Sequence, residues 1–137
     1  MSQQNIGLVQ SGYAAFGRGD IPGFLSLLDA TVDWNTPGPS DLPIAGRRRG
    51  PAQVGEFFGR LAGLIEFEQF EPTSFLADGD KVVVIGHEKY KVKATGKSIS
   101  GDWCHVFTVR NGKIVAFQEF IDTAEFVGEL RTAGARA

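Results

Sequence analysis

Three short turn sequences divide the second half of the chain at regular intervals. They are Ala-Asp-Gly-Asp at 77–80, Ala-Thr-Gly-Lys at 94–97 and Arg-Asn-Gly-Lys at 110–113. Glycine beside Asp, Thr or Asn is typical of the tight turns of β-hairpins. Each turn joins two runs rich in β-branched and aromatic residues. From Glu66 onward, the sequence therefore predicts a four-stranded antiparallel meander.

The first half of the chain has the periodicity of helices. Apolar side chains recur at helical spacing at Ile6, Val9, Tyr13 and Phe16. Asp20 is suited to cap a second helix, with Pro22 in its first turn. A third helix is expected from about Pro51, because one broad apolar face is formed by Val54, Phe57, Phe58, Leu61 and Leu64.

Three further segments complete the predicted order of elements. Residues 31–36 are expected to form a short strand, and residues 37–50 a Pro/Gly loop whose three arginines, 47–49, are solvated. A short last helix is expected from Asp122, where Asp-Thr-Ala-Glu resembles a capping sequence. Helices that precede a run of strands indicate an α+β fold, with the helices packed on one face of the sheet.

Composition narrows the class of protein. The chain has 137 residues, of which 42% are hydrophobic and 22% charged, so residues 1–137 are expected to form a single domain. A net charge of −2 gives no general attraction to nucleic acid or to anionic membranes. Cys104 is the only cysteine, which excludes an internal disulfide and argues against a zinc site. No signal peptide or membrane span is predicted, so the expected location is the cytoplasm.

Alternation along two predicted strands places polar side chains among apolar ones. In residues 81–93 the lysines share one face, and Glu88 lies on the other with valines and Tyr90. In residues 98–110, Trp103 and His105 share the apolar face. Both Glu88 and His105 are therefore expected to point towards the helices.

The strand at 113–122 has less distinct faces, and the set that contains Phe117 and Glu119 is expected to face inward. Burying a carboxylate without a partner costs several kcal/mol or forces the group to take up a proton. A buried Glu88 or Glu119 with a raised pKa suits acid–base catalysis near neutral pH. The alternative is a simple ion pair with His105.

Three segments carry a resemblance to a known superfamily, namely residues 13–38, 50–58 and 105–126. They resemble the nuclear transport factor two-like superfamily, and within it the SnoaL-like group of polyketide cyclases, ketosteroid isomerases and limonene epoxide hydrolases. The resemblance covers essentially the whole chain. It implies a cystatin-like cone, with three N-terminal helices packed on a curved, mostly antiparallel sheet and a short C-terminal helix.

The resemblance also suggests roles for single residues. Asn35, Asp122 and Glu88 fall where the epoxide hydrolases hold and activate water, although Gly86 stands where that group has an arginine. His105 falls where the ketosteroid isomerases have a protonated aspartic acid. A cyclase of this group would combine an acidic residue with a His or Asn that holds an enolate, and Asp122, Glu88 or Glu119 together with His105 could supply this pair.

The sequence thus predicts a protein that binds a hydrophobic small molecule and acts on it by acid–base chemistry, without metal or organic cofactor. Cyclisation, isomerisation and water addition are the candidate reactions. The candidate catalytic residues are Glu88, His105, Asp122, Asn35 and Glu119. The apolar walls are expected to include Tyr13, Phe16, Trp34, Phe57, Leu61, Tyr90 and Trp103.

A non-catalytic alternative stays open. In a module that only binds a small ligand or dimerises, His105 would be a core histidine, Asp122 a helix cap and Asn35 a turn residue.

The outer sheet face also carries too much apolar surface for contact with water. A homodimer through that face is expected, as in the resembling families, because it would cover Val83, Ile85, Cys104, Val106 and either Ile114 or Phe120.

Overall fold

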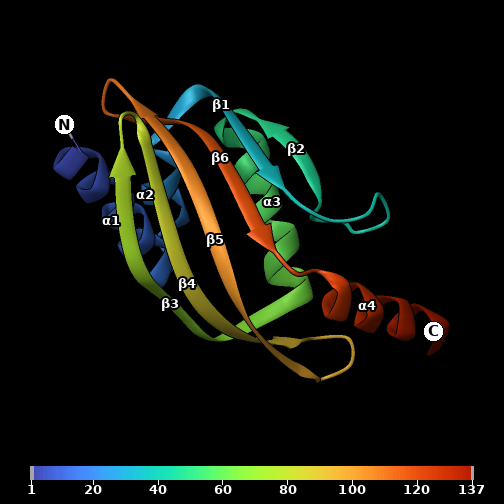
Figure 1. Cartoon of the computed structure of the whole chain (residues 1–137). Coiled ribbons are helices and arrows are strands. Elements are labelled where there is room, and N and C mark those ends of the chain that lie inside the picture. The colour runs from blue at the N-terminus through green and yellow to red at the C-terminus, as the bar shows by residue number, and fades with distance from the viewer. Residues whose placement is uncertain (1, 137) are drawn as a thin grey trace.

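A curved sheet forms one layer of the molecule, and helices cover its inner face (Figure 1). The structure is a computed structural model in which residues 2–136 are described, except for the side chains of 135 and 136. Helices α1 (Ser2–Gly17), α2 (Ile21–Leu25) and α3 (Gly50–Leu64) form the second layer, and α4 (Ala124–Arg136) extends beyond the end of the sheet. The predicted α+β architecture is confirmed.

The sheet has six strands in the order β2-β1-β6-β5-β4-β3. All neighbouring pairs are antiparallel except β1 and β6, which run parallel. This pairing brings the first strand beside the last, so the sheet can curve around the helices. The strands are β1 (Leu28–Thr36), β2 (Gly46–Arg49), β3 (Ile65–Asp78), β4 (Lys81–Val92), β5 (Ser98–Arg110) and β6 (Lys113–Ile121).

Local sequence explains the turns and one helix start. The three predicted hairpins are present, with Gly79, Gly96 and Gly112 at φ values of 59°, 77° and 73°, in the left-handed region that glycine adopts readily. The Asp20 carboxylate accepts a hydrogen bond from the Gly23 N–H at 2.9 Å, so it caps α2 as expected. That helix ends after only five residues.

The expectation of a loop over residues 37–50 is partly wrong, because Gly46–Arg49 form the edge strand β2. The strand was not predicted because its sequence, Gly-Arg-Arg-Arg, has no apolar residues that could alternate. Arg48 is half-buried: it donates a hydrogen bond to the Ile44 carbonyl at 3.0 Å and lies 4.9 Å from the ring centre of Phe57. The arginine run is therefore part of the sheet and not a loop, although Arg47 and Arg49 are exposed as expected.

The inner faces of β4 and β5 follow the predicted alternation. Their register is continuous from the Lys81–Thr108 pair to the Lys91–Ser98 pair, so every second side chain points towards the helices. Of the two residues left open for the outer face, Phe120 is 56% exposed, whereas Ile114 is fully buried. The cause is a register shift after Thr108, which changes the facing of the residues beside the turn.

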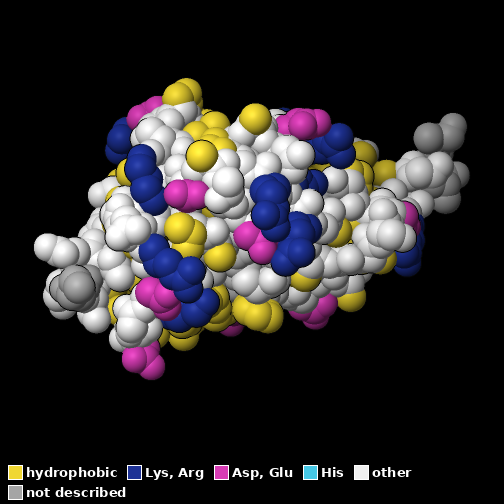
Figure 2. Space-filling model, turned by 90° about the horizontal axis from the view of Figure 1, so that it is seen from above, with side chains coloured by type: hydrophobic (Ala, Val, Ile, Leu, Met, Phe, Trp, Pro, Cys, Tyr) yellow, Lys and Arg dark blue, Asp and Glu magenta, His cyan; other side chains and the backbone are white. Residues whose placement is uncertain are grey.

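The surface carries both signs of charge. In the view of Figure 2, Lys and Arg side chains lie among Asp and Glu side chains, with small hydrophobic groups between them. Among the described helices, none combines the length and the apolar character that a membrane crossing requires.

The Trp103 indole of β5 packs closely on the backbone of Gly86 of β4 at the centre of the sheet. The two residues are direct cross-strand partners. A Cβ atom at Gly86 would lie 2.1 Å from Cζ2 of Trp103 and 2.5 Å from two other atoms of that ring. The indole therefore occupies the space that any other residue at this position would need.

Replacing Gly86 with Ala should lower the free energy of unfolding by about 1–3 kcal/mol, because the buried indole must move. Urea denaturation measures this loss. Gly101→Ala is the matched control, since a Cβ there meets nothing within 4 Å, and it should leave stability unchanged or slightly raised. Equal effects of the two substitutions would contradict the assigned packing.

Candidate acid–base site in an aromatic cavity

A cavity of about 70 Å³ lies between the inner face of the sheet and helices α1, α2 and α3. Most of its wall is aromatic, with rings contributed by these three helices and by four strands, β1, β3, β5 and β6. Such a wall favours an apolar or aromatic ligand. Four polar side chains also line it, namely Thr36, Glu88, His105 and Glu119.

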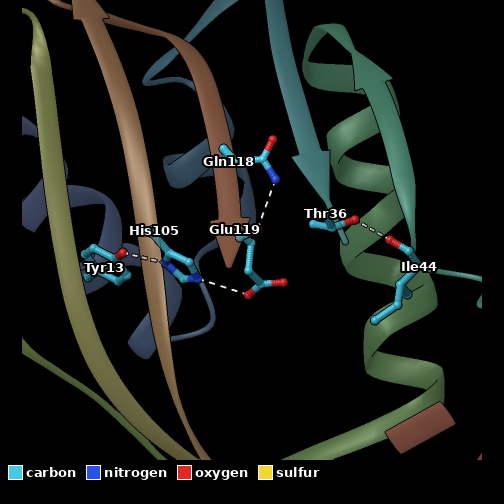
Figure 3. A network of polar contacts seen from close by, with 6 residues as sticks. All are labelled: Tyr13, Thr36, Ile44, His105, Gln118 and Glu119. Carbon is cyan, nitrogen blue, oxygen red and sulfur yellow. Dashed lines mark hydrogen bonds and ion pairs between the residues drawn. The ribbon is translucent and has the colours of Figure 1, made fainter. Parts of the chain in front are cut away.

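A chain of hydrogen bonds links three of the lining residues (Figure 3). The Tyr13 hydroxyl on α1 lies 2.7 Å from Nδ1 of His105, and Nε2 of His105 lies 3.0 Å from Oε2 of Glu119. His105 and Glu119 are direct cross-strand partners on β5 and β6. A carboxylate only accepts, so Nε2 carries a proton; in the neutral imidazole, Nδ1 then accepts the hydrogen bond from Tyr13.

Aromatic packing fixes the orientation of the His105 ring. The ring stacks on Trp103 with centroids 4.1 Å apart and planes inclined by 21°. Phe117 meets it edge-on from β6 at 4.8 Å. The imidazole is 6% exposed, so it cannot rotate without displacing these neighbours.

Glu88 enters the cavity from β4 and is 6% exposed. In the described part of the chain, its carboxyl makes no side-chain hydrogen bond or ion pair. Burial, and to a smaller extent the charge of Glu119, raise the pKa of Glu88 to about 8. The carboxyl is therefore mostly protonated at neutral pH and can donate a proton.

Tyr13 and Glu119 are the two ends of the hydrogen-bond chain, and Glu88 is not part of it. Burial and then the charge of Glu119 raise the pKa of the Tyr13 phenol far above its usual value, so it stays protonated. Only one oxygen of Glu119 contacts His105, and Figure 3 shows the other oxygen directed away from the imidazole.

The structure brings together three of the five residues predicted as catalytic. Asn35 does not line the cavity: it lies on the face of β1 opposite to Trp34. Asp122 is exposed and accepts a hydrogen bond from the Ala124 N–H at 3.0 Å, at the start of α4. The three that do line the cavity are Glu88, His105 and Glu119. Within the described residues, no group of three or more His, Cys, Asp or Glu side chains is placed to hold a metal ion.

Most of the predicted wall residues also reach the cavity, namely Tyr13, Phe16, Trp34, Phe57 and Leu61. Tyr90 and Trp103 do not. Tyr90 belongs to a separate core cluster and meets Phe126 of α4, with ring centroids 5.6 Å apart. Trp103 lies beside the cavity, where it supports His105.

Several lining residues were missed from the sequence. Phe107 and Phe117 lie on the predicted inner faces, so alternation could have identified them. Phe67 and Phe70 both line the cavity although they are three positions apart, because a register shift in β3 interrupts the alternation. The remaining missed residues are Phe24, Thr36 and Phe58.

Comparison with known proteins agrees with this architecture. Residues 9–117 match the model of the SnoaL-like domain. The chain belongs to this SnoaL-like family. An NTF2-like protein from Burkholderia xenovorans has 33% identity and a TM-score of 0.84, with 93% of this chain and 96% of that chain covered. Among curated proteins, none matches the sequence.

Two more solved structures resemble this SnoaL-like protein closely. An NTF2-like protein of unknown function from Burkholderia pseudomallei has 31% identity and a TM-score of 0.85, covering 91% of this chain and 95% of that one. TerC, co-crystallised with polyporic acid, has 28% identity and a TM-score of 0.80, covering 91% and 96%. The shared fold extends over nearly the whole of each chain.

The raised pKa of Glu88 predicts a specific dependence of stability on pH. Between the ordinary glutamate pKa of about 4.5 and the folded value of about 8, the unfolded state loses this proton while the folded state keeps it. The free energy of unfolding should therefore fall as pH rises through this range, by up to about 1.4 kcal/mol per pH unit from this group.

Urea denaturation at pH 5, 6, 7 and 8 tests this prediction. Glu88→Gln removes the ionisable group, so the variant should lose less stability over this range than the wild type does. Glu68→Gln, at an exposed site on β3, is the control and should retain the wild-type dependence. If the free energy of unfolding of Glu88→Gln changed with pH in parallel with that of the wild type, a protonated Glu88 would be contradicted.

Proposed function

We propose that this SnoaL-like protein binds a small apolar carbonyl compound in the aromatic cavity and catalyses proton transfer on it, as an isomerase or cyclase does, without a cofactor. The observation that carries the proposal is the presence of two carboxyl groups with different environments in one cavity. Glu88 is buried and protonated, whereas Glu119 offers a carboxylate oxygen. Such a pair provides an acid and a base at the same pH.

The reaction follows from these protonation states. The Glu119 carboxylate takes a proton from the carbon next to the ligand carbonyl. The electron pair of that C–H bond forms a C=C bond, and the π pair of the C=O bond moves to the oxygen. Glu88 gives its proton to this oxygen, which forms an enol. The enol can regain a proton at another carbon or attack a second carbonyl group. Tyr13 and His105 act as positioning residues that orient Glu119.

Trp34 offers a further polar contact. It lines the cavity and is 3% exposed, and its indole N–H has no hydrogen-bond acceptor among the described residues. A buried donor without an acceptor is unfavourable. An oxygen atom of a bound ligand would satisfy it, which supports a carbonyl ligand rather than a hydrocarbon.

The second candidate is a protein that holds such a ligand without reaction. The observation in its favour is that both ring nitrogens of His105 are hydrogen-bonded within the protein. The co-crystal of TerC with polyporic acid supports an organic ligand in a related chain and is consistent with either candidate. A measurement of proton transfer separates them.

Exchange of α-protons for deuterium in acetophenone, followed by NMR in D₂O, tests the proposal. The wild type should accelerate this exchange above the buffer rate. Glu119→Gln should reduce the acceleration by at least about 100-fold, because it removes the base, and Glu88→Gln by about 10-fold or more. The wild-type rate should fall above about pH 8 as Glu88 loses its proton.

Asp122→Asn provides the control, because Asp122 lies outside the cavity and Asn can still cap α4. It should exchange protons at the wild-type rate. If the wild type quenches its tryptophan fluorescence on adding acetophenone or polyporic acid but gives only the buffer rate of exchange, the ligand-holding candidate replaces the catalytic one.

We also propose that the outer face of the sheet forms a homodimer. Two adjacent rows of apolar side chains cross this face along the strand pairing, and Ile85 and Phe120 in one row are 44% and 56% exposed. A contiguous exposed patch of this kind is typical of an interface, and a two-fold axis would cover the same patch on both copies. The two rows are Ile85–Cys104–Phe120 and Leu76–Val83–Val106.

Phe120→Glu should convert the dimer to a monomer, because it places one charge from each copy in the apolar contact. Sedimentation velocity at micromolar concentration measures the change. Ala52→Glu, on the exposed side of α3, adds the same charge on the other layer and should leave the dimer intact. A monomeric wild type would contradict the proposal.

A further inference from the structure

A second hollow of about 380 Å³ lies directly outside the cavity, beside α3 and β3. We call it the outer hollow. All of the side chains that line it are apolar, and the remaining lining positions are glycines. Four residues line both spaces, namely Phe16, Phe58, Leu61 and Phe67. A single layer of side chains therefore separates the outer hollow from the acid–base groups.

The cavity alone admits only a small group. At roughly 10–15 Å³ for each water-sized group, its volume of about 70 Å³ holds about five to seven such groups, which is close to one ring. A ligand larger than one ring must extend out of the cavity. The outer hollow is the adjoining space, and its apolar lining suits only an apolar extension.

The separating layer is made of rings that contact one another by their edges or at an angle. The Phe16 centroid lies 5.6 Å from that of Phe58 and 5.8 Å from that of Phe67. All three side chains are half-buried, so rotation of one ring opens a passage without unpacking the fully buried core. The passage would connect the two spaces.

The sequence of α3 keeps the outer hollow open. Gly55 and Gly59, one helical turn apart, both line it. A Cβ atom added at Gly55 would lie 3.2 Å from Cδ1 of Leu25, whereas one added at Gly59 would meet nothing within 4 Å. Glycine in the interior of a helix is less favourable than alanine. Its presence here is explained if the space beside α3 must stay unfilled.

We propose that the outer hollow binds the apolar extension of the ligand, an alkyl chain or second ring attached to the carbonyl-bearing group that reacts in the cavity. The location of that reacting group rests on the proposed function. The ligand class is therefore an elongated aryl ketone, with its polar end at Glu88 and Glu119 and its apolar end beside Gly59.

Binding of acetophenone and octanophenone, measured by quenching of tryptophan fluorescence, tests this assignment. In the wild type, octanophenone should bind at least about 50-fold more tightly than acetophenone, which corresponds to about twofold for each added CH₂ group. Gly59→Leu should weaken octanophenone binding at least about tenfold and leave acetophenone within about twofold. Gly63→Leu, on the same helix with nothing within 4 Å and outside the lining, should leave both affinities within about twofold.

No gain in affinity from acetophenone to octanophenone in the wild type would overturn the proposal. Equal effects of Gly59→Leu and Gly63→Leu would also overturn it. Exchange of the acetophenone α-protons reports separately on the proposed function. Loss of octanophenone binding in Gly59→Leu without any proton exchange in the wild type would support the outer hollow as a binding site and reject the acid–base chemistry.

Discussion

The stacking of His105 on Trp103, above the backbone of Gly86, is the interaction on which the rest of the site depends. The indole can lie there only because residue 86 has no Cβ atom. With the imidazole held in one plane, its two nitrogens meet Tyr13 from a helix and Glu119 from the neighbouring strand. Helix α1 is thereby joined at one point to the consecutive strands β5 and β6, and one oxygen of Glu119 faces away from the imidazole (Figure 3).

Burial then gives the two carboxyl groups different chemistry. Glu88 has lost most of its contact with water and also faces the charge of Glu119, so its neutral form is favoured. Glu119, in contrast, accepts a hydrogen bond from the N–H of His105. The aromatic wall strengthens both the effect of burial on Glu88 and the hydrogen bond between His105 and Glu119, because the rings exclude water and lower the local dielectric response. The same wall selects an apolar ligand, so the recognition of the ligand and the tuning of the acid have a common physical cause.

The sequence allowed the fold and the central residues of the site to be predicted, but not all of the residues that surround them. Alternation correctly predicted the facing of Glu88 and His105, because the register between β4 and β5 has no bulge. It failed for Phe67 and Phe70, where β3 shifts register. Asn35 was suggested by resemblance, yet one strand cannot direct both Trp34 and its neighbour Asn35 into the same cavity. β2 was missed because its sequence, Gly-Arg-Arg-Arg, has no apolar period, and it forms through pairing with β1.

Titration of the glutamate side-chain carboxyl carbons by ¹³C NMR shows whether Glu88 keeps its proton at neutral pH. The signal of Glu88 is identified as the one that is missing from the spectrum of Glu88→Gln. We expect this carboxyl to titrate near pH 8, far above the ordinary range of glutamate. A Glu88 carboxyl that titrates between about pH 4 and 5 would be ionised at neutral pH. That result would remove the acid from the proposed pair and contradict the account.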